Sequence, residues 1–174
     1  WRLNFGFQGN IPERAFNKNI SRFNNKNGGA GVHLCPTWFV YKNLSLAVNM
    51  EYAMVVEDYQ TDKIDVFNII SFTPRVRYYF TDLKIRPFAG LGAGFYHVLS
   101  HSPKINLGIC PVVGINIYDY FELSMEYNKI LNNIKINPSS MGAFDNYYLA
   151  VKGSFSIGIF GKKPKKDNNP ASFD

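Results

Sequence analysis

A short cluster of histidine and serine residues is the part of this chain best suited to chemistry: His97, Ser100, His101 and Ser102. Nucleophilic catalysis needs a base within hydrogen-bond reach of a hydroxyl group, and a third group that orients the base. His101 and a neighbouring serine would supply two parts, and Glu57 or Asp58 could supply the third. Nothing in the sequence fixes that geometry, and a polar loop naturally holds such residues. We therefore expect the chain not to be an enzyme.

The two cysteines, Cys35 and Cys110, each precede a proline. The strands expected to carry them lie on opposite walls of a barrel, whereas the Cα atoms of a disulfide lie within about 7 Å of each other. We expect two small buried thiols rather than a bridge. No spacing typical of metal ligands is present, and no cofactor is expected.

The net charge of +6 is concentrated in two segments. One is the Asn-rich segment 9–28, where Arg14, Lys18, Arg22 and Lys26 face only Glu13. The other is the end of the chain, 161–174, with four lysines and two aspartates. The basic loop could contact lipopolysaccharide phosphates, dock a partner protein, or be a solvated loop. Because the excess sits in one loop and one tail, nucleic acid is not an expected partner.

The elements that would position these residues are strands. From Asn146 to Phe160, apolar and polar residues alternate along the chain, which indicates one β-strand with an apolar and a polar face. Strands in soluble proteins usually run about 5–6 residues, whereas membrane-spanning strands need about 9–11. No apolar run is suited to a membrane-spanning helix, because the longest uncharged stretch, Pro87–Pro103, is interrupted by glycines.

The sequence predicts eight strands joined alternately by long and short connections. The strands are expected at about Arg2–Gln8, Ala30–Tyr41, Leu44–Val56, Val66–Phe80, Ile85–Val98, Ile105–Ile117, Phe121–Ile130 and Asn146–Phe160. The longer connections are 9–29, 57–65, 99–104 and 131–145, and the short ones are 42–43, 81–84 and 118–120. Long loops at one end and short turns at the other are typical of outer-membrane barrels.

One face of these strands is apolar and the other collects the charges. The charged set is Arg2, Glu51, Arg75, Arg77, Glu122, Glu126 and Lys152. An eight-stranded barrel has an interior just wide enough for side chains, and buried charges must be paired. We expect a filled interior crossed by Arg–Glu pairs, with Gly90, Gly92 and Gly94 making room for the arginines. Aromatic residues near the strand ends predict girdles at the membrane interfaces: Trp38, Tyr41, Tyr78, Tyr79, Phe80, Tyr118, Tyr120, Phe121, Tyr127, Tyr147 and Tyr148.

The stretch from Arg86 to Tyr96, RPFAGLGAGFY, resembles the "RPYxGxGxGY" strand of small outer-membrane β-barrels. Residues 110–117 and 121–127 are similar to the hairpin of the same proteins. The resemblance spans Leu3 to Phe160 and points to the OmpA/OmpX-like superfamily, notably its Bacteroidetes-type members. It implies an architecture but no single activity, because such barrels serve as anchors, adhesins, lipid enzymes and subunits of larger machines.

The fold expected is therefore an all-β, eight-stranded antiparallel up-and-down transmembrane β-barrel over residues 1–160. Residues 161–174 are expected to form a basic, disordered periplasmic tail. An outer-membrane protein needs an export signal, so the start at Trp1 is interpreted as a mature or trimmed chain. The expected location is the outer membrane, with both termini in the periplasm.

The expected function is a non-enzymatic scaffold or accessory subunit of an envelope complex. Its expected partners are outer-membrane lipid, lipopolysaccharide and other envelope proteins. Two alternatives remain open. One is a lipid A deacylase or acyltransferase, as in some eight-stranded barrels, with His97 or His101 in its site. The other is a soluble lipocalin-like barrel, whose interior would be apolar and whose charges would lie outside, since alternation alone does not distinguish inside from outside.

Overall fold

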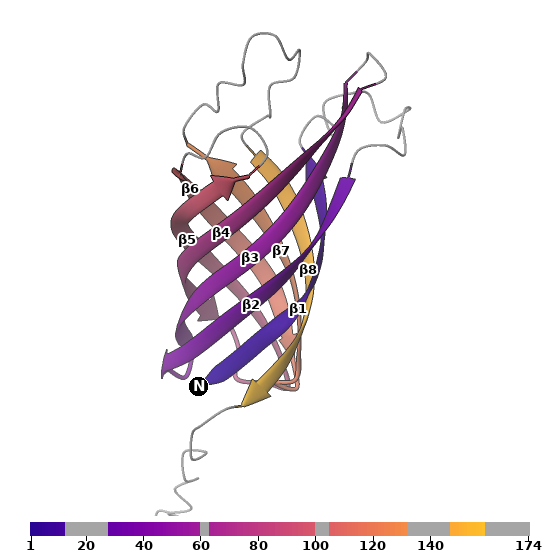
Figure 1. The fold of residues 1–174 in the computed structure, drawn as a ribbon. Helices are drawn as coiled ribbons and strands as arrows, with labels where there is room; N and C mark the ends of the chain where they lie inside the picture. Colours follow the sequence, from indigo (N-terminus) through magenta and orange to yellow (C-terminus); the bar gives the residue numbers. More distant parts are fainter. Residues whose placement is uncertain (13–27, 60–62, 100–104, 132–146, 159–174) are drawn as a thin grey trace, which may run out of the picture.

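The computed structural model describes residues 1–12, 28–59, 63–99, 105–131 and 147–158. It contains eight strands: β1 (Arg2–Pro12), β2 (Gly28–Tyr41), β3 (Leu44–Tyr59), β4 (Lys63–Tyr79), β5 (Ile85–Val98), β6 (Ile105–Ile117), β7 (Phe121–Ile130) and β8 (Tyr147–Gly158). Each strand pairs antiparallel with the next, and β1 pairs with β8 to close the barrel (Figure 1). Among the described residues, no helix is long and apolar enough to cross a bilayer. The predicted fold class is confirmed.

The two ends of the barrel differ. The tight connections β2–β3, β4–β5 and β6–β7 lie at one end, which we call the short-turn end. The start of β1 and the end of β8 lie at this end too (Figure 1). The connections at the opposite, long-loop end fall mostly within 13–27, 60–62, 100–104 and 132–146, outside the described residues.

Four strands reach further toward the long-loop end than the sequence predicted. β1 continues to Pro12, β2 begins at Gly28, and β3 and β4 extend to Tyr59 and Lys63. Polar composition marked these segments as loops, but their backbones continue the ladder, with Glu57 opposite Asp65. Backbone pairing does not require apolar side chains, so a prediction from composition made these four strands too short. The end of β8 at Gly158 leaves Phe160 outside the described residues.

The alternation places charges inside and apolar side chains outside. On β4, the residues that point inward are buried: Ser71, Thr73, Arg75, Arg77 and Tyr79. Their neighbours on the same strand are exposed: Ile70, Phe72, Val76 and Tyr78. This is the reverse of the arrangement that a soluble lipocalin-like barrel requires, and it suits a barrel surrounded by lipid.

The interior is layered along the barrel axis. A cluster of buried apolar residues occupies the part toward the long loops: Ala53, Val55, Phe67, Ile69, Tyr96, Val98, Ile130, Tyr148 and Ala150. A smaller cluster of Tyr79, Phe88 and Val112, with Phe39 packed against it, lies toward the short turns. Charged and amide side chains fill the space between. Each apolar cluster therefore lies between the central charges and one end of the barrel.

Aromatic residues lie on the outer face near both ends. The rings of Trp1 and Trp38 meet edge to face at 4.5 Å near the short turns, and those of Tyr127 and Tyr147 lie 6.0 Å apart toward the long loops. Two residues expected in these girdles, Tyr79 and Tyr148, instead point inward and are fully buried. Side chains alternate between the two faces of a strand, and both tyrosines fall on the inward-facing positions, although they lie near strand ends.

Candidate functional site

A chain of ion pairs crosses the middle of the barrel. Arg75 on β4 donates to both carboxylate oxygens of Glu126 on β7. The ammonium of Lys152 on β8 lies 2.7 Å from Oε2 of Glu126 and 2.6 Å from Oε2 of Glu51 on β3. All four side chains are buried, and the two cations balance the two carboxylates. Such a set satisfies the requirement that charges removed from water be paired.

A second pair lies closer to the short turns. Nη1 of Arg77 lies 3.1 and 3.2 Å from the two oxygens of Glu122. The guanidinium of Arg77 also lies over the ring of Phe88, 5.1 Å from its centroid. The pair therefore couples a bifurcated hydrogen bond to a cation–π contact.

Of the seven charged residues grouped by sequence, Arg2 stands apart. Its Nη2 lies 2.7 Å from Oδ1 of Asp119, in the β6–β7 turn, rather than against an interior carboxylate. The structure thus brings six of the seven into two ion-pair groups and places the seventh at the short-turn end.

Uncharged polar residues complete the surroundings of Glu51. Gln8 and the Tyr148 hydroxyl donate to its Oε1 at 2.7 and 2.8 Å, and Asn49 donates to its Oε2 at 3.0 Å. Sequence analysis missed these partners because it singled out only charged residues. All of them share the inward parity of the alternation, which is the signal that could have identified them.

Glycines on β5 leave the space that the arginines occupy. Gly92 and Gly90 lie opposite Arg75 and Arg77 in the ladder. A Cβ on Gly90 would lie 2.5 Å from the backbone oxygen of Val76 and 3.0 Å from Cγ of Arg77. One on Gly92 would lie 2.8 Å from Cγ2 of Thr73 and 3.1 Å from Cβ of Arg75. The glycine-rich motif therefore has a packing role in this interior.

The two cysteines are free and buried. Cys35 Sγ lies 3.4 Å from Nη2 of Arg77, and Cys110 Sγ lies 3.8 Å from Nη2 of Arg75. Within the described part of the chain, no group of His, Cys, Asp and Glu could hold a metal ion. The thiols fill space beside the guanidinium groups.

The residues considered for catalysis are not brought together within the described chain. His97 is half-buried on the outer face of β5, and its neighbours across the ladder are Ile70 and Ile105. Ser100, His101 and Ser102 lie outside the described residues. Glu57 and Asp58 belong to the extended part of β3.

Arg14, Lys18, Arg22 and Lys26 lie outside the described residues, as do 161–174. Their suggested contacts with lipopolysaccharide or a partner remain predictions.

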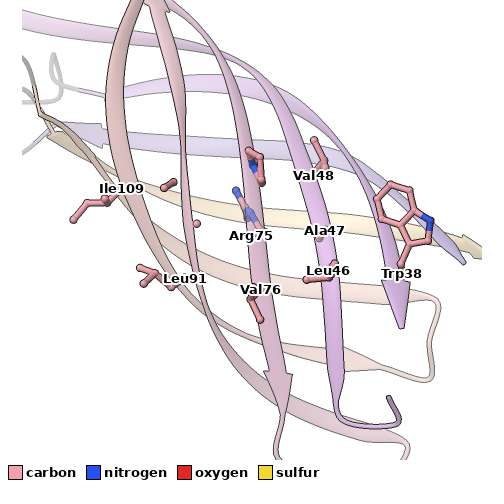
Figure 2. Close-up of a pocket in the computed structure, with 11 residues that line it drawn as sticks. Trp38, Leu46, Ala47, Val48, Arg75, Val76, Leu91 and Ile109 are labelled. Atoms are coloured by element: carbon pink, nitrogen blue, oxygen red, sulfur yellow. The ribbon is translucent and has the colours of Figure 1, made fainter. Parts of the chain in front are cut away.

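An open groove of about 610 Å³ runs over the outer face of β2 to β6 (Figure 2). Small residues form its floor, including Ala47, Pro74, Gly92 and Ala93, while Leu46, Leu91 and Ile109 rise around it. Pro74 has no N–H, and the β4–β5 ladder skips from Phe72–Phe95 to Arg75–Gly92 at this position. The groove is lined by apolar surface and faces the region that lipid tails occupy.

No family model and no curated protein matches the chain. Solved structures are similar at 12% identity. The outer membrane enzyme PagL superposes with a TM-score of 0.54, over 91% of this chain and 100% of that one. OprG from Pseudomonas aeruginosa gives 0.55, over 90% and 94%. The N-terminal β-barrel domain of OprF from Pseudomonas aeruginosa gives 0.51, over 90% and 97%.

These likenesses define a class of fold. The chain is an eight-stranded transmembrane β-barrel with the architecture of small outer-membrane proteins. The class includes an enzyme and other barrels, and at 12% identity the likeness concerns the fold alone.

Proposed function

We propose that this chain is a non-enzymatic barrel of the outer membrane that acts as a scaffold or accessory subunit of an envelope complex. The observation that carries the proposal is the layer of paired charges across the barrel, formed by Arg75, Glu126, Lys152 and Glu51. An eight-stranded barrel has little interior volume beyond its side chains. With the centre occupied, the loops, the short-turn mouth and the outer face remain for contacts with other molecules.

Native extraction tests the scaffold role. The protein is extracted from membranes in mild detergent, sized, and its companions are identified by mass spectrometry. We expect a defined complex larger than the 19.8 kDa chain. Recovery of the barrel alone, under conditions that preserve other envelope complexes, would contradict the accessory role.

A conductance measurement tests the filled interior separately. In planar bilayers, the purified barrel is expected to show no steady open state, whereas Arg75→Ala with Glu126→Ala removes the central pair and is expected to raise conductance. Stable open conductance of the unaltered protein would contradict a filled interior.

The proposed orientation places the short turns and both termini in the periplasm, as in outer-membrane barrels. Both the start of β1 and the end of β8 lie at the short-turn end (Figure 1). A cysteine introduced at Lys42, in the β2–β3 turn, should resist a membrane-impermeant thiol reagent in intact cells and react after the outer membrane is opened. Labelling in intact cells would reverse the orientation.

The basic loop is proposed to contact lipopolysaccharide. Arg14, Lys18, Arg22 and Lys26 would supply charge-assisted bonds to its phosphates. Glutamine at all four positions should weaken binding of the detergent-solubilised barrel to lipopolysaccharide and reduce its dependence on salt. Unchanged binding would leave the loop without this role.

A lipid A-modifying enzyme is the second candidate. It is favoured by the outward His97 on β5. The apolar neighbours of His97 across both ladders speak against it. Lipid A mass spectra from cells with and without the gene, and with His97→Ala, decide the matter. A mass change that depends on His97 would replace the scaffold proposal.

A further inference from the structure

Two arginines from opposite walls of the barrel meet at the short-turn mouth. Arg2 starts β1 and Arg86 lies near the start of β5, four strands away in the closed sheet. Both guanidinium groups contact one atom, Oδ1 of Asp119. Arg86 is also held by Asn116, whose Oδ1 accepts from its Nη2 at 3.2 Å.

Aromatic rings form the floor beneath these cations. The Arg2 guanidinium carbon lies 4.9 Å from the ring centroid of Phe39. That of Arg86 lies 5.6 Å from Phe39 and 5.2 Å from Tyr79. Stacked on one side, the guanidinium groups are oriented with their donors available to a ligand in their plane. The mouth therefore carries two fixed cations.

Asp119 fits this pair of cations imperfectly. It uses a single oxygen for both arginines, whereas arginine binds carboxylates best through two parallel hydrogen bonds. Among the described residues, Nη1 of Arg2 is buried and has no hydrogen-bond partner. Asp119 is the carboxylate in direct contact with both guanidinium groups, while Asp82 and Glu122 act on them from a longer distance.

The turn that holds Asp119 is strained. Tyr118 and Asp119 have φ angles of 52° and 64°, and Tyr120 N–H donates to the Ile117 carbonyl at 3.1 Å. Such two-residue turns favour Asn-Gly, and a bulky residue such as tyrosine is unfavourable at positive φ. The Asp119 side chain is 56% exposed. It can leave the arginines without the barrel opening.

We propose that Arg2 and Arg86 form a carboxylate-binding site at the short-turn mouth, for an acidic peptide segment, in which Asp119 is a displaceable internal ligand. The carboxylate of Asp119 already shows which chemistry the two cations accept. An external carboxylate can engage both oxygens and so use donors that Asp119 leaves unpaired. Lys42 and Lys84, in the neighbouring short turns, outnumber the one acidic residue of those turns, Asp82, and favour approach of an acidic chain.

The position of the site favours a ligand that approaches from the aqueous side over a lipid headgroup. The side chains of Arg2 and Arg86 are 11% and 13% exposed and lie over inward rings, not on the lipid face. A headgroup anchored in the leaflet would have to bend around the barrel rim to reach them. A peptide that approaches along the barrel axis meets them directly.

The site can be tested by NMR titration of the full barrel in detergent micelles, a method that reaches weak affinities. The probe is an N-acetylated tri-glutamate peptide, with tri-glutamine and inorganic phosphate as comparisons. Arg2→Gln and Arg86→Gln should each weaken tri-glutamate binding by about tenfold, the loss expected for one charge-assisted contact. Lys42→Gln removes a charge from the same end without touching the site and should change affinity less than about twofold.

Asp119 variants give the distinguishing result. Asp119→Asn and Asp119→Gly suit a turn with positive φ and remove the competing carboxylate, so both should tighten binding by up to about tenfold. If Asp119 is only a structural anchor, these variants should weaken binding. Weaker binding by these variants would overturn the proposal. So would equal binding of tri-glutamine or phosphate, or equal effects of Lys42→Gln and Arg86→Gln. Because this titration uses the isolated barrel, a negative result would not contradict the scaffold proposal, which is tested by extraction of the native protein.

Discussion

Lys152 on β8 lies 2.6 Å from Glu51 on β3, although 101 positions separate them in the chain. The same ammonium also contacts Glu126 at 2.7 Å. Lys152 therefore holds two buried carboxylates apart in a space where neither reaches water. Its removal exposes each carboxylate to the repulsion of the other, with only Arg75 left to balance both.

Replacement of this lysine is the first prediction. Lys152→Met should lower the free energy of unfolding by about 3–5 kcal/mol, the usual cost of leaving a buried charge without its partner. Urea unfolding in lipid vesicles measures it. Lys129→Met is the matched control, because Lys129 is exposed on the outer face of β7 and should cost little.

The double variant Lys152→Met with Glu51→Gln shows whether the cost of losing Lys152 comes from its ion pair or from its packing. If the charges are coupled, the double variant should cost less than the sum of the two single variants, by about 0.5–3 kcal/mol. Additive costs would mean that Lys152 acts through packing alone.

Much of this interior follows from parity along each strand. Arg75, Arg77, Glu122 and Glu126 fall on the inward side because side chains alternate with period two. Which acid meets which base does not follow from parity. Arg75 and Glu126 lie on β4 and β7, and their meeting depends on the stagger of strands around the closed barrel, which no local pattern encodes.

Asp119 shows a second limit of sequence reasoning. In the sequence it is one polar residue of a short turn, and exposure to water alone would explain a polar residue there. Its contacts come from β1 and β5, so they exist only once the barrel has closed. Strand ends were missed for a related reason, since the pairing of Glu57 with Asp65 depends on the backbone of the neighbouring strand.

Gly94 gives the second prediction. A Cβ at this position would lie 2.1 Å from the backbone oxygen of Phe72, so β4 or β5 must move to accept any side chain. Gly94→Ala should lower the free energy of unfolding by about 1–3 kcal/mol, the range for overpacking. Gly9→Ala is the control, because no atom of the described residues lies within 4 Å of its added Cβ. Equal effects of the two changes would mean that backbone flexibility, not contact, sets the cost.

The third prediction concerns the thiols. Cys35 and Cys110 are 1% and 0% exposed inside the barrel. In the folded protein both should resist a maleimide reagent, and both should react fully after unfolding. Electrophoretic mobility should be the same with and without reductant, since no bridge joins them. Rapid alkylation of the folded barrel would indicate water access to the charged layer.

The last prediction tests which surface faces lipid. Leu91 is 61% exposed near the middle of β5 and borders the outer groove (Figure 2). Arginine placed on a lipid face costs about 2–4 kcal/mol at the bilayer midplane and about 0–1 kcal/mol near the interface. Leu91→Arg should therefore destabilise the barrel in vesicles far more than Tyr41→Arg, since Tyr41 ends β2 at the short turns. A barrel that does not span the bilayer should tolerate both changes equally. A small, equal cost at the two positions in vesicles would therefore contradict the membrane-spanning assignment.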